Sequence, residues 1–200
     1  MINVLSINQI QELRRRTGAG ALQCKQILER TGGDLDLATE ELQALGAVAV
    51  QDRGERPTSE GVISSYVHHN GKLGVLIEVN CETDFVARTE DFRTLVRYLG
   101  EQVAGAAPIA VSRDALPAHT VAQRRRAFEA EVRASGKPAH LAVRIIDGKM
   151  DAYFRSVVLM DQAWVRDSEI TIAELVRQVA ARIGENIQVR RFARFHMGIA

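Results

Sequence analysis

The chain has 200 residues, of which 46% are hydrophobic and 26% charged, and its formal net charge is +1. This composition excludes a disordered or fibrous protein, and the small net charge argues against a protein that coats nucleic acid, because that work needs a large excess of Lys and Arg. The chain has no run of about 18 apolar residues and no basic leader before an apolar block, so we expect a cytoplasmic protein that does not associate with a membrane.

Residues 1–49 predict a domain of three short helices. "SINQ" at 6–9 has the spacing of a capping box and opens the first helix, and "TGAG" at 17–20 forms a turn before the second. "GGD" at 32–34 ends the second helix and caps a third, which we expect to stop before Gly46. So small a core is marginal by itself, and we expect it to dock on a partner or on the rest of the chain.

The segment "VQDRGERPTSEG", residues 50–61, has no apolar residue after its first and is rich in charge, Gly and Pro. Such a composition is typical of a linker. We therefore place a domain boundary here and assign residues 62–200 to a second, dimerising domain.

The second domain opens with a β-hairpin. "VISSYVHH" and "KLGVLIEVN" flank Asn70-Gly71, a dipeptide that tolerates the positive φ angles of a tight hairpin turn. Alternating apolar residues from Leu73 to Val79 give the second strand one buried face.

Helices follow the hairpin. Apolar residues recur at helical spacing in 92–103 and again in 172–183, and Thr89 is placed to cap the first of these helices. We also predict a helix over 121–134, one or two more within 137–154, and a final strand over 186–195. The second domain is thus an α+β fold in which a small antiparallel sheet packs against helices on one face.

Only two cysteines are present, which excludes a disulfide framework or a multi-cysteine zinc site, and we predict no metal site and no cofactor. Cys81 with His68 and His69 raises the alternative of a thiol hydrolase. The histidines, however, belong to the far end of the hairpin, roughly 30 Å away at the usual rise of a strand. A surface histidine pair and a buried cysteine fit this pattern better.

"RRFARF" at 190–195 interleaves Arg with Phe and raises the alternative of a surface on which nucleic-acid bases stack. On a strand its residues alternate between two faces, which favours a half-buried strand instead. The arginine runs at 14–16 and 124–126 spread around their helices, as solvated charge does.

"TDFV" at 83–86 follows directly on the second strand and carries an aromatic residue where a chain normally turns polar. Phe85 either folds back under the next helix or stands out beside Asp84 as an anchor for a partner's pocket. The residues alone favour burial, which is the commoner fate of a phenylalanine, and leave the second possibility open.

Several stretches resemble the elongation factor Ts family of bacteria. The "RTGAG" and "ETDFVAR" motifs are very specific, and the match stays in register from end to end. The matching stretches are "LRRRTGAGALQCK" (13–25), "GGDLDLATEEL" (32–42), "HHNGKLGVLIEVNCETDFVARTEDF" (68–92) and "GENIQVRRFARF" (184–195).

The resemblance implies a guanine nucleotide exchange factor for elongation factor Tu, with no covalent chemistry of its own, and a ubiquitin-associated-like N-terminal domain. In the family, an Asp-Phe pair reaches the magnesium site of the GTPase, and an N-terminal surface makes a second contact. These positions fall here on a magnesium-dislocating segment of Thr83, Asp84, Phe85 and Val86, and on an N-terminal set of Arg14, Ala21 and Leu22. Many relatives carry Met-Met where this chain has Ala-Leu, which implies a smaller N-terminal contact.

Longer members of the family carry a second core subdomain and a helical-hairpin insertion, for which we expect 200 residues to leave no room. The chain therefore resembles the short form, and we expect a non-covalent homodimer in which two cores replace the duplicated one. Two rival functions stay open: an adaptor that binds without affecting nucleotide release, and nucleic-acid binding through Arg190, Arg191 and Arg194.

Overall fold

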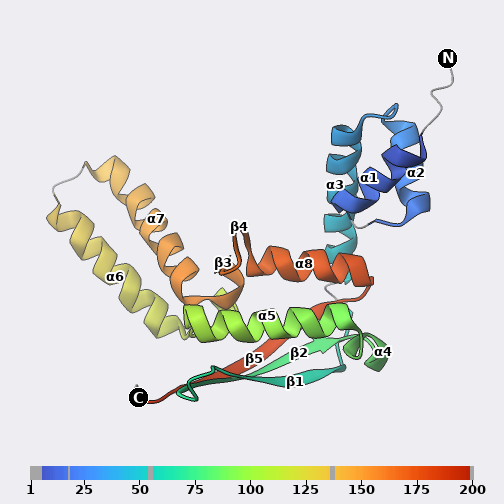
Figure 1. The fold of residues 1–200 in the computed structure, drawn as a ribbon. Coiled ribbons are helices and arrows are strands. Elements are labelled where there is room, and N and C mark those ends of the chain that lie inside the picture. The colour runs from blue at the N-terminus through green and yellow to red at the C-terminus, as the bar shows by residue number, and fades with distance from the viewer. Residues whose placement is uncertain (1–5, 18, 54–55, 136–137, 199–200) are drawn as a thin grey trace.

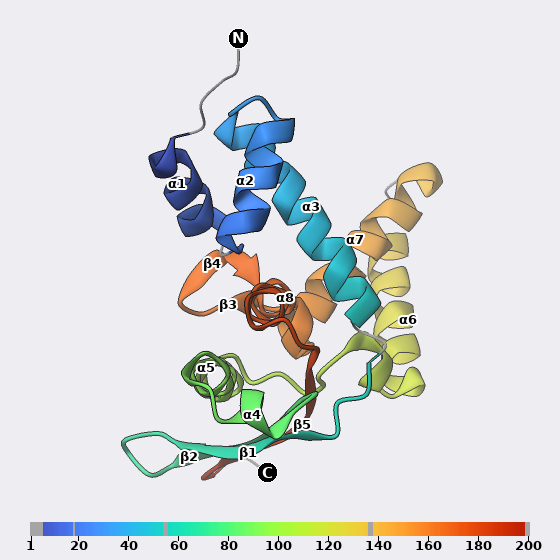
Figure 2. The ribbon, with the colours of Figure 1, turned by 90° about the vertical axis from the view of Figure 1, so that its right-hand side faces the viewer.

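The computed structural model describes residues 6–17, 19–53, 56–135 and 138–198, with the side chains of 46–53 and 139 left aside. Three layers are stacked in order: a sheet, the helices that cover it, and an N-terminal helical unit (Figures 1 and 2). A pair of long helices projects from one end of the covering layer (Figure 1). The α+β class predicted from the sequence is confirmed.

The N-terminal unit consists of α1 (Ile7–Thr17), α2 (Ala21–Arg30) and α3 (Leu35–Arg53). Both predicted caps are present. The Ser6 hydroxyl accepts from the Gln9 amide at 3.2 Å while the Gln9 side chain accepts from the Ser6 amide at 3.0 Å, and Asp34 accepts from the first amides of α3. The small core between the helices is made of Leu13, Cys24, Ile27, Leu28, Ala38 and Leu42.

The end predicted for the third helix is wrong. α3 runs through Gly46 to Arg53 and so occupies the first residues of the proposed linker. A glycine inside a helix costs about 1 kcal/mol relative to alanine, and that cost is offset where neighbouring residues form helix well and the helix packs. α3 contacts α8 (Ile172–Ile183), as Figure 2 shows. Where the two domains divide stays a prediction, with residues 54–55 outside the described part of the chain.

The sheet has three antiparallel strands in the order β1-β2-β5: β1 (Glu60–Val67), β2 (Leu73–Cys81) and β5 (Ile187–His196). The predicted hairpin and the predicted last strand are confirmed, and Gly71 has the positive φ of 66° that the turn requires. β2 lies in the centre and turns one face inward, where every second residue is buried.

α5 (Glu90–Ala106) covers the inner face of the sheet, and α8 packs against α5. Thr89 caps α5 as predicted, since its side chain accepts from the Phe92 amide. Phe92 is completely buried at the centre of the main core. The core joins β2 and α5, which are neighbours in sequence, to the distant α8.

α6 (Ala118–Ala134) and α7 (Ala139–Val157) form a long antiparallel pair that projects away from the sheet (Figure 1). The helices predicted in this region are confirmed, but the expectation that the chain has no room for a helical hairpin is wrong. The pair buries Val132, Ile146 and Met150 between its two helices. These residues form a small core of their own, which stabilises the helix pair although it extends away from the main core.

The remaining elements are short. α4 (Asp84–Ala87) joins β2 to α5, and a hairpin of β3 (Ala163–Trp164) and β4 (Asp167–Thr171) precedes α8. Two 3₁₀ turns, Arg113–Ala115 and Leu159–Asp161, flank the α6–α7 pair. Among the described residues, no helix is long and apolar enough to span a membrane.

We predict that Phe92→Ala lowers the free energy of unfolding by about 3–5 kcal/mol, because it leaves a cavity in the main core. Phe85→Ala serves as the matched control: its ring is 77% exposed, so we expect a change within about 0.5 kcal/mol. Urea unfolding of both variants measures the difference. Equal losses of stability in the two variants would contradict the assignment of core and surface.

Candidate functional site

The TDFV segment forms a single helical turn at the end of β2. Thr83 is its N-cap, with extended backbone angles and a side chain that accepts from the Val86 amide at 3.3 Å. Asp84 is the first helical residue, and its carboxylate pairs with the Arg88 guanidinium at 2.7 Å on the surface. The turn therefore exists because its cap and its first acidic residue both suit a helix N-terminus.

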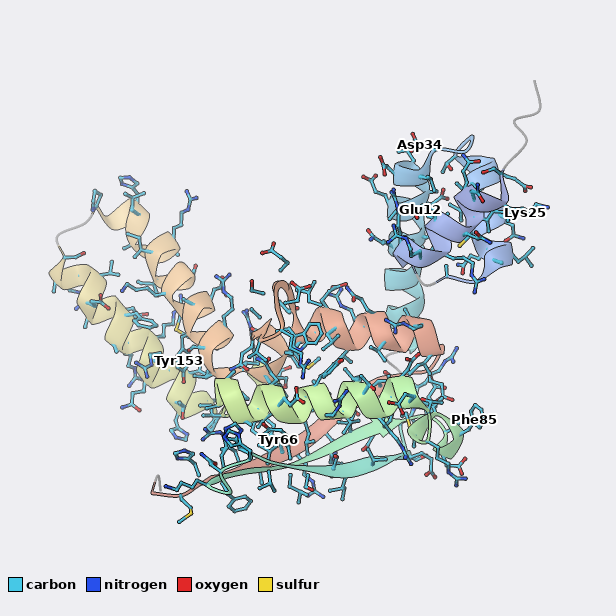
Figure 3. The ribbon with its side chains drawn as sticks, viewed as in Figure 1. Glu12, Lys25, Asp34, Tyr66, Phe85 and Tyr153 are labelled. Atoms are coloured by element: carbon cyan, nitrogen blue, oxygen red, sulfur yellow. The ribbon has the colours of Figure 1, made fainter. Side chains whose placement is uncertain are left out.

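Phe85 points out of the molecule. Its side chain is 77% exposed, the largest exposed fraction among the large hydrophobic residues of the described chain. Figure 3 shows it at the outer edge of the fold, beyond the end of α5. The prediction that Phe85 folds back under the next helix is wrong, because the residue stands out beside Asp84; its role as an anchor for a partner stays a prediction.

The next two residues of the turn anchor it from beneath. Val86 and Ala87 are buried in the main core, and the Thr89 hydroxyl donates to the Val86 carbonyl at 2.8 Å. An exposed aromatic ring thus stands on a turn whose other side is buried in the main core. Such a ring needs little further ordering when it enters a partner.

Glu185 holds the beginning of the turn and was not singled out by the sequence analysis. One carboxylate oxygen accepts from the backbone amides of Glu82 and Thr83, and the other accepts from the Thr83 hydroxyl. Glu185 belongs to the stretch "GENIQVRRFARF" that resembles the family, but nothing in that stretch indicates a contact with Thr83. Arg88, the partner of Asp84, was also missed, although its position four residues after Asp84 is a spacing at which opposite charges pair on a helix.

The N-terminal set lies on a separate part of the molecule. Arg14 is exposed on α1, while Ala21 and Leu22 are exposed in the first turn of α2, with Leu22 at 70%. The set is separated from the TDFV segment by the layer that contains α8 (Figures 1 and 2). The fold therefore presents two distinct candidate surfaces and does not bring them into one site.

The thiol-hydrolase alternative fails on geometry and on charge. Cys81 pairs with Glu60 at one end of the hairpin, whereas His68 donates its backbone amide to Leu73 at the other. Cys81 is completely buried, and burial, with a smaller contribution from the Glu185 carboxylate, raises the pKa of its thiol to about 11. A nucleophilic thiolate needs the opposite shift.

The arginines of β5 are partly engaged within the fold. Arg191 pairs with Glu78 at 2.6 Å, and the Arg194 guanidinium donates to the Ala104 carbonyl. Phe192 packs against the main core. These contacts weaken β5 as a platform for stacked bases, which needs free cations beside exposed rings.

Comparison with known proteins identifies the relationship. The profile of the family described as "Elongation factor TS" matches residues 36–199. The chain belongs to this family. It is 45% identical over 194 residues to elongation factor Ts of Anaeromyxobacter dehalogenans, a match that spans 97% of this chain and 89% of that protein. It is 42% identical to elongation factor Ts of Fervidobacterium nodosum, over 97% of this chain and 98% of the relative.

Elongation factor Ts of Thermotoga petrophila is likewise 41% identical, over 97% of this chain and 96% of that protein. The alignments with these relatives extend beyond the part matched by the profile and cover nearly the whole chain. Membership in the elongation factor Ts family makes this protein a translation elongation factor.

We predict that Cys81 resists alkylation at pH 8 in the folded protein. A pKa of about 11 leaves about one thiol in a thousand ionised, against about one in four for a free cysteine of pKa 8.5. Mass spectrometry after iodoacetamide treatment, with urea-unfolded protein as the control, measures the labelling rate. Rapid labelling of Cys81 in the folded state would contradict its burial.

Proposed function

We propose that this protein is a guanine nucleotide exchange factor for elongation factor Tu, and that Asp84 and Phe85 disturb the magnesium and phosphate site of that GTPase. The observation that carries the proposal is the exposed Phe85 on an anchored turn. Membership in the elongation factor Ts family supports the choice of partner.

A protruding aromatic side chain is suited to act as a wedge. Its burial in a partner is worth roughly 1.5–3 kcal/mol, which is about ten- to two-hundred-fold in an equilibrium at 1.4 kcal/mol per decade. Magnesium neutralises the phosphate charge of a bound nucleotide, so a ring that shifts the residues around the metal weakens nucleotide binding. The protein itself does no covalent chemistry in this scheme.

One wedge is insufficient for fast exchange, and the two separated surfaces offer a second source of binding energy. Arg14, Ala21 and Leu22 would hold another part of the GTPase while the TDFV segment acts on its nucleotide site. Because coupling is reciprocal, a nucleotide that binds the GTPase loosens this protein by the same factor. The exchange factor thus accelerates turnover without setting its direction.

The outer face of the sheet supports a homodimer. Three rows of residues cross it: Val67, Gly74 and Phe195; Ser65, Leu76 and Ala193; and Ile63, Glu78 and Arg191. Four of these are large exposed hydrophobics, and no helix of the described chain covers them (Figures 1 and 2). A second copy presents the same apolar rows and can therefore cover them. The Glu78–Arg191 ion pair lies at the edge of this apolar surface in each copy. Since Cys24 and Cys81 are both buried, such a dimer is held without a disulfide.

The adaptor alternative shares the binding surfaces but not the effect on nucleotide. In an adaptor, Phe85 would only anchor the partner. The affinity for the partner would then depend on the ring, whereas the rate of nucleotide release would not. We place the protein in the cytoplasm with elongation factor Tu, and we expect neither a membrane nor a nucleic acid as a direct partner.

We predict that Phe85→Ala keeps the fold and part of the affinity for elongation factor Tu but loses most of the acceleration of exchange, by about tenfold or more. Release of a fluorescent GDP analogue from the GTPase, with and without the protein, measures the effect. Ile109→Ala, which removes another exposed hydrophobic side chain at a distance from α4, is the control. Full activity of Phe85→Ala would exclude the wedge, and no acceleration by the wild type would leave only the adaptor.

We predict that the wild type sediments as a dimer and that Phe195→Glu sediments as a monomer, because the substitution puts a charge into one of the apolar rows of this face. Sedimentation velocity over a concentration series measures both. Ile109→Glu, at 61% exposure in the segment that bonds to Val157 of α7 and outside the strands of the sheet, should leave the dimer intact. A wild type that is monomeric at every concentration would contradict the dimer.

A further inference from the structure

Glu185 reaches the functional turn from a distant part of the chain. α8 ends at Gly184, which adopts a φ of 88° and donates its amide to the Ala180 carbonyl at 2.8 Å. This left-handed residue reverses the chain as glycine readily does. The next side chain, Glu185, is thereby delivered to the end of β2, where α4 begins.

The carboxylate of Glu185 makes three hydrogen bonds there. Its Oε2 accepts from the amides of Glu82 and Thr83 at 3.2 and 3.1 Å, and its Oε1 accepts from the Thr83 hydroxyl at 2.7 Å. The contact is reciprocal, since the Glu82 carboxylate accepts from the Asn186 amide at 2.6 Å. Hydrogen bonds to an ionised acceptor are about twice as strong as those between neutral groups. These bonds therefore hold residues 82–83 and 185–186 together.

We propose that Glu185 is a positioning residue that fixes the direction in which Phe85 is presented to the GTPase. This inference rests on the proposed function, in which Phe85 is the group that acts. Glu185 does not belong to the TDFV segment, and it would act on Phe85 through the Thr83 cap.

The link from Glu185 to Phe85 passes through Thr83. The Thr83 hydroxyl donates to Glu185 and accepts from the Val86 amide, so the carboxylate orients the group that caps α4. A helix of four residues has no stability of its own. Its geometry is therefore set by the cap on one side and by the buried Val86 and Ala87 on the other.

Phe85 has few contacts with which to orient itself. At 77% exposure its ring is directed almost entirely by the backbone of the turn. If the cap loosens, the ring samples more directions and fewer of them fit the partner, which lowers the effect of the wedge. Buried Val86 and Ala87 keep the turn attached to the core even then, so the loss is one of direction and not of folding.

The test compares GDP-analogue release at saturating concentrations of Glu185→Ala, Glu185→Gln, Phe85→Ala and the double variant Glu185→Ala with Phe85→Ala. We expect Glu185→Ala to slow release by about tenfold, while affinity for nucleotide-free elongation factor Tu falls far less. Glu185→Gln keeps one acceptor oxygen and should be intermediate. In the Phe85→Ala background, Glu185→Ala should have no further effect, since it acts only through the ring.

Glu101→Ala is the matched control, because Glu101 is also partly buried but pairs with Arg166 near the other end of α5. It should exchange like the wild type. A merely structural Glu185 would slow exchange equally with and without Phe85; either full activity of Glu185→Ala or such additive losses overturns the proposal. A wild type that fails to accelerate release would instead refute the proposed function, so the two failures are distinguishable.

Discussion

The packing of one face of the sheet on α5 is the interaction on which the rest of the structure depends. β2 is the central strand, and its inward residues meet Phe92 and the other buried residues of α5. Covering a sheet on one face only has two consequences. In the described part of the chain, the opposite face keeps four large hydrophobic residues exposed. The short connection from β2 to α5 turns at the rim of the core, so one side of it faces solvent.

That connection carries the turn with Phe85. Val86 and Ala87 are drawn into the core by the same packing that holds α5, and a helical turn that directs them inward leaves Phe85 directed outward. Polar contacts from Thr83 and Glu185 fix the turn at its start. An exposed phenylalanine lacks the roughly 1.5–3 kcal/mol of stabilisation that burial of its side chain would give. The contacts around the turn hold it in one conformation, so this exposure is a defined feature of the fold.

The sequence predicts correctly those helices, strands and caps whose pattern lies within a single segment. Alternation in β2, helical spacing in α5 and α8, and the caps at Ser6, Asp34 and Thr89 all correspond to contacts in the structure. These features are local, so neighbouring residues are enough to specify them.

Features that depend on distant partners were missed. α3 continues through Gly46 where it packs on α8, and the β3–β4 hairpin is too short to leave a pattern. Whether Phe85 lies inside or outside depends on which neighbours occupy the core, and the residues alone favoured the wrong answer. Glu185 is separated from Thr83 by 102 positions, and no local pattern connects an acid after one helix with the cap of another.

The proposed function requires that Phe85 leaves water and enters elongation factor Tu when the two proteins bind. Hydroxyl-radical footprinting, read by mass spectrometry on the free protein and on its nucleotide-free complex with the GTPase, measures this directly. We expect strong oxidation of exposed Phe85 in the free protein, and oxidation as low as that of buried Phe92 in the complex. Phe85 that is oxidised equally in both states, in a complex whose formation is verified by sedimentation, would contradict it.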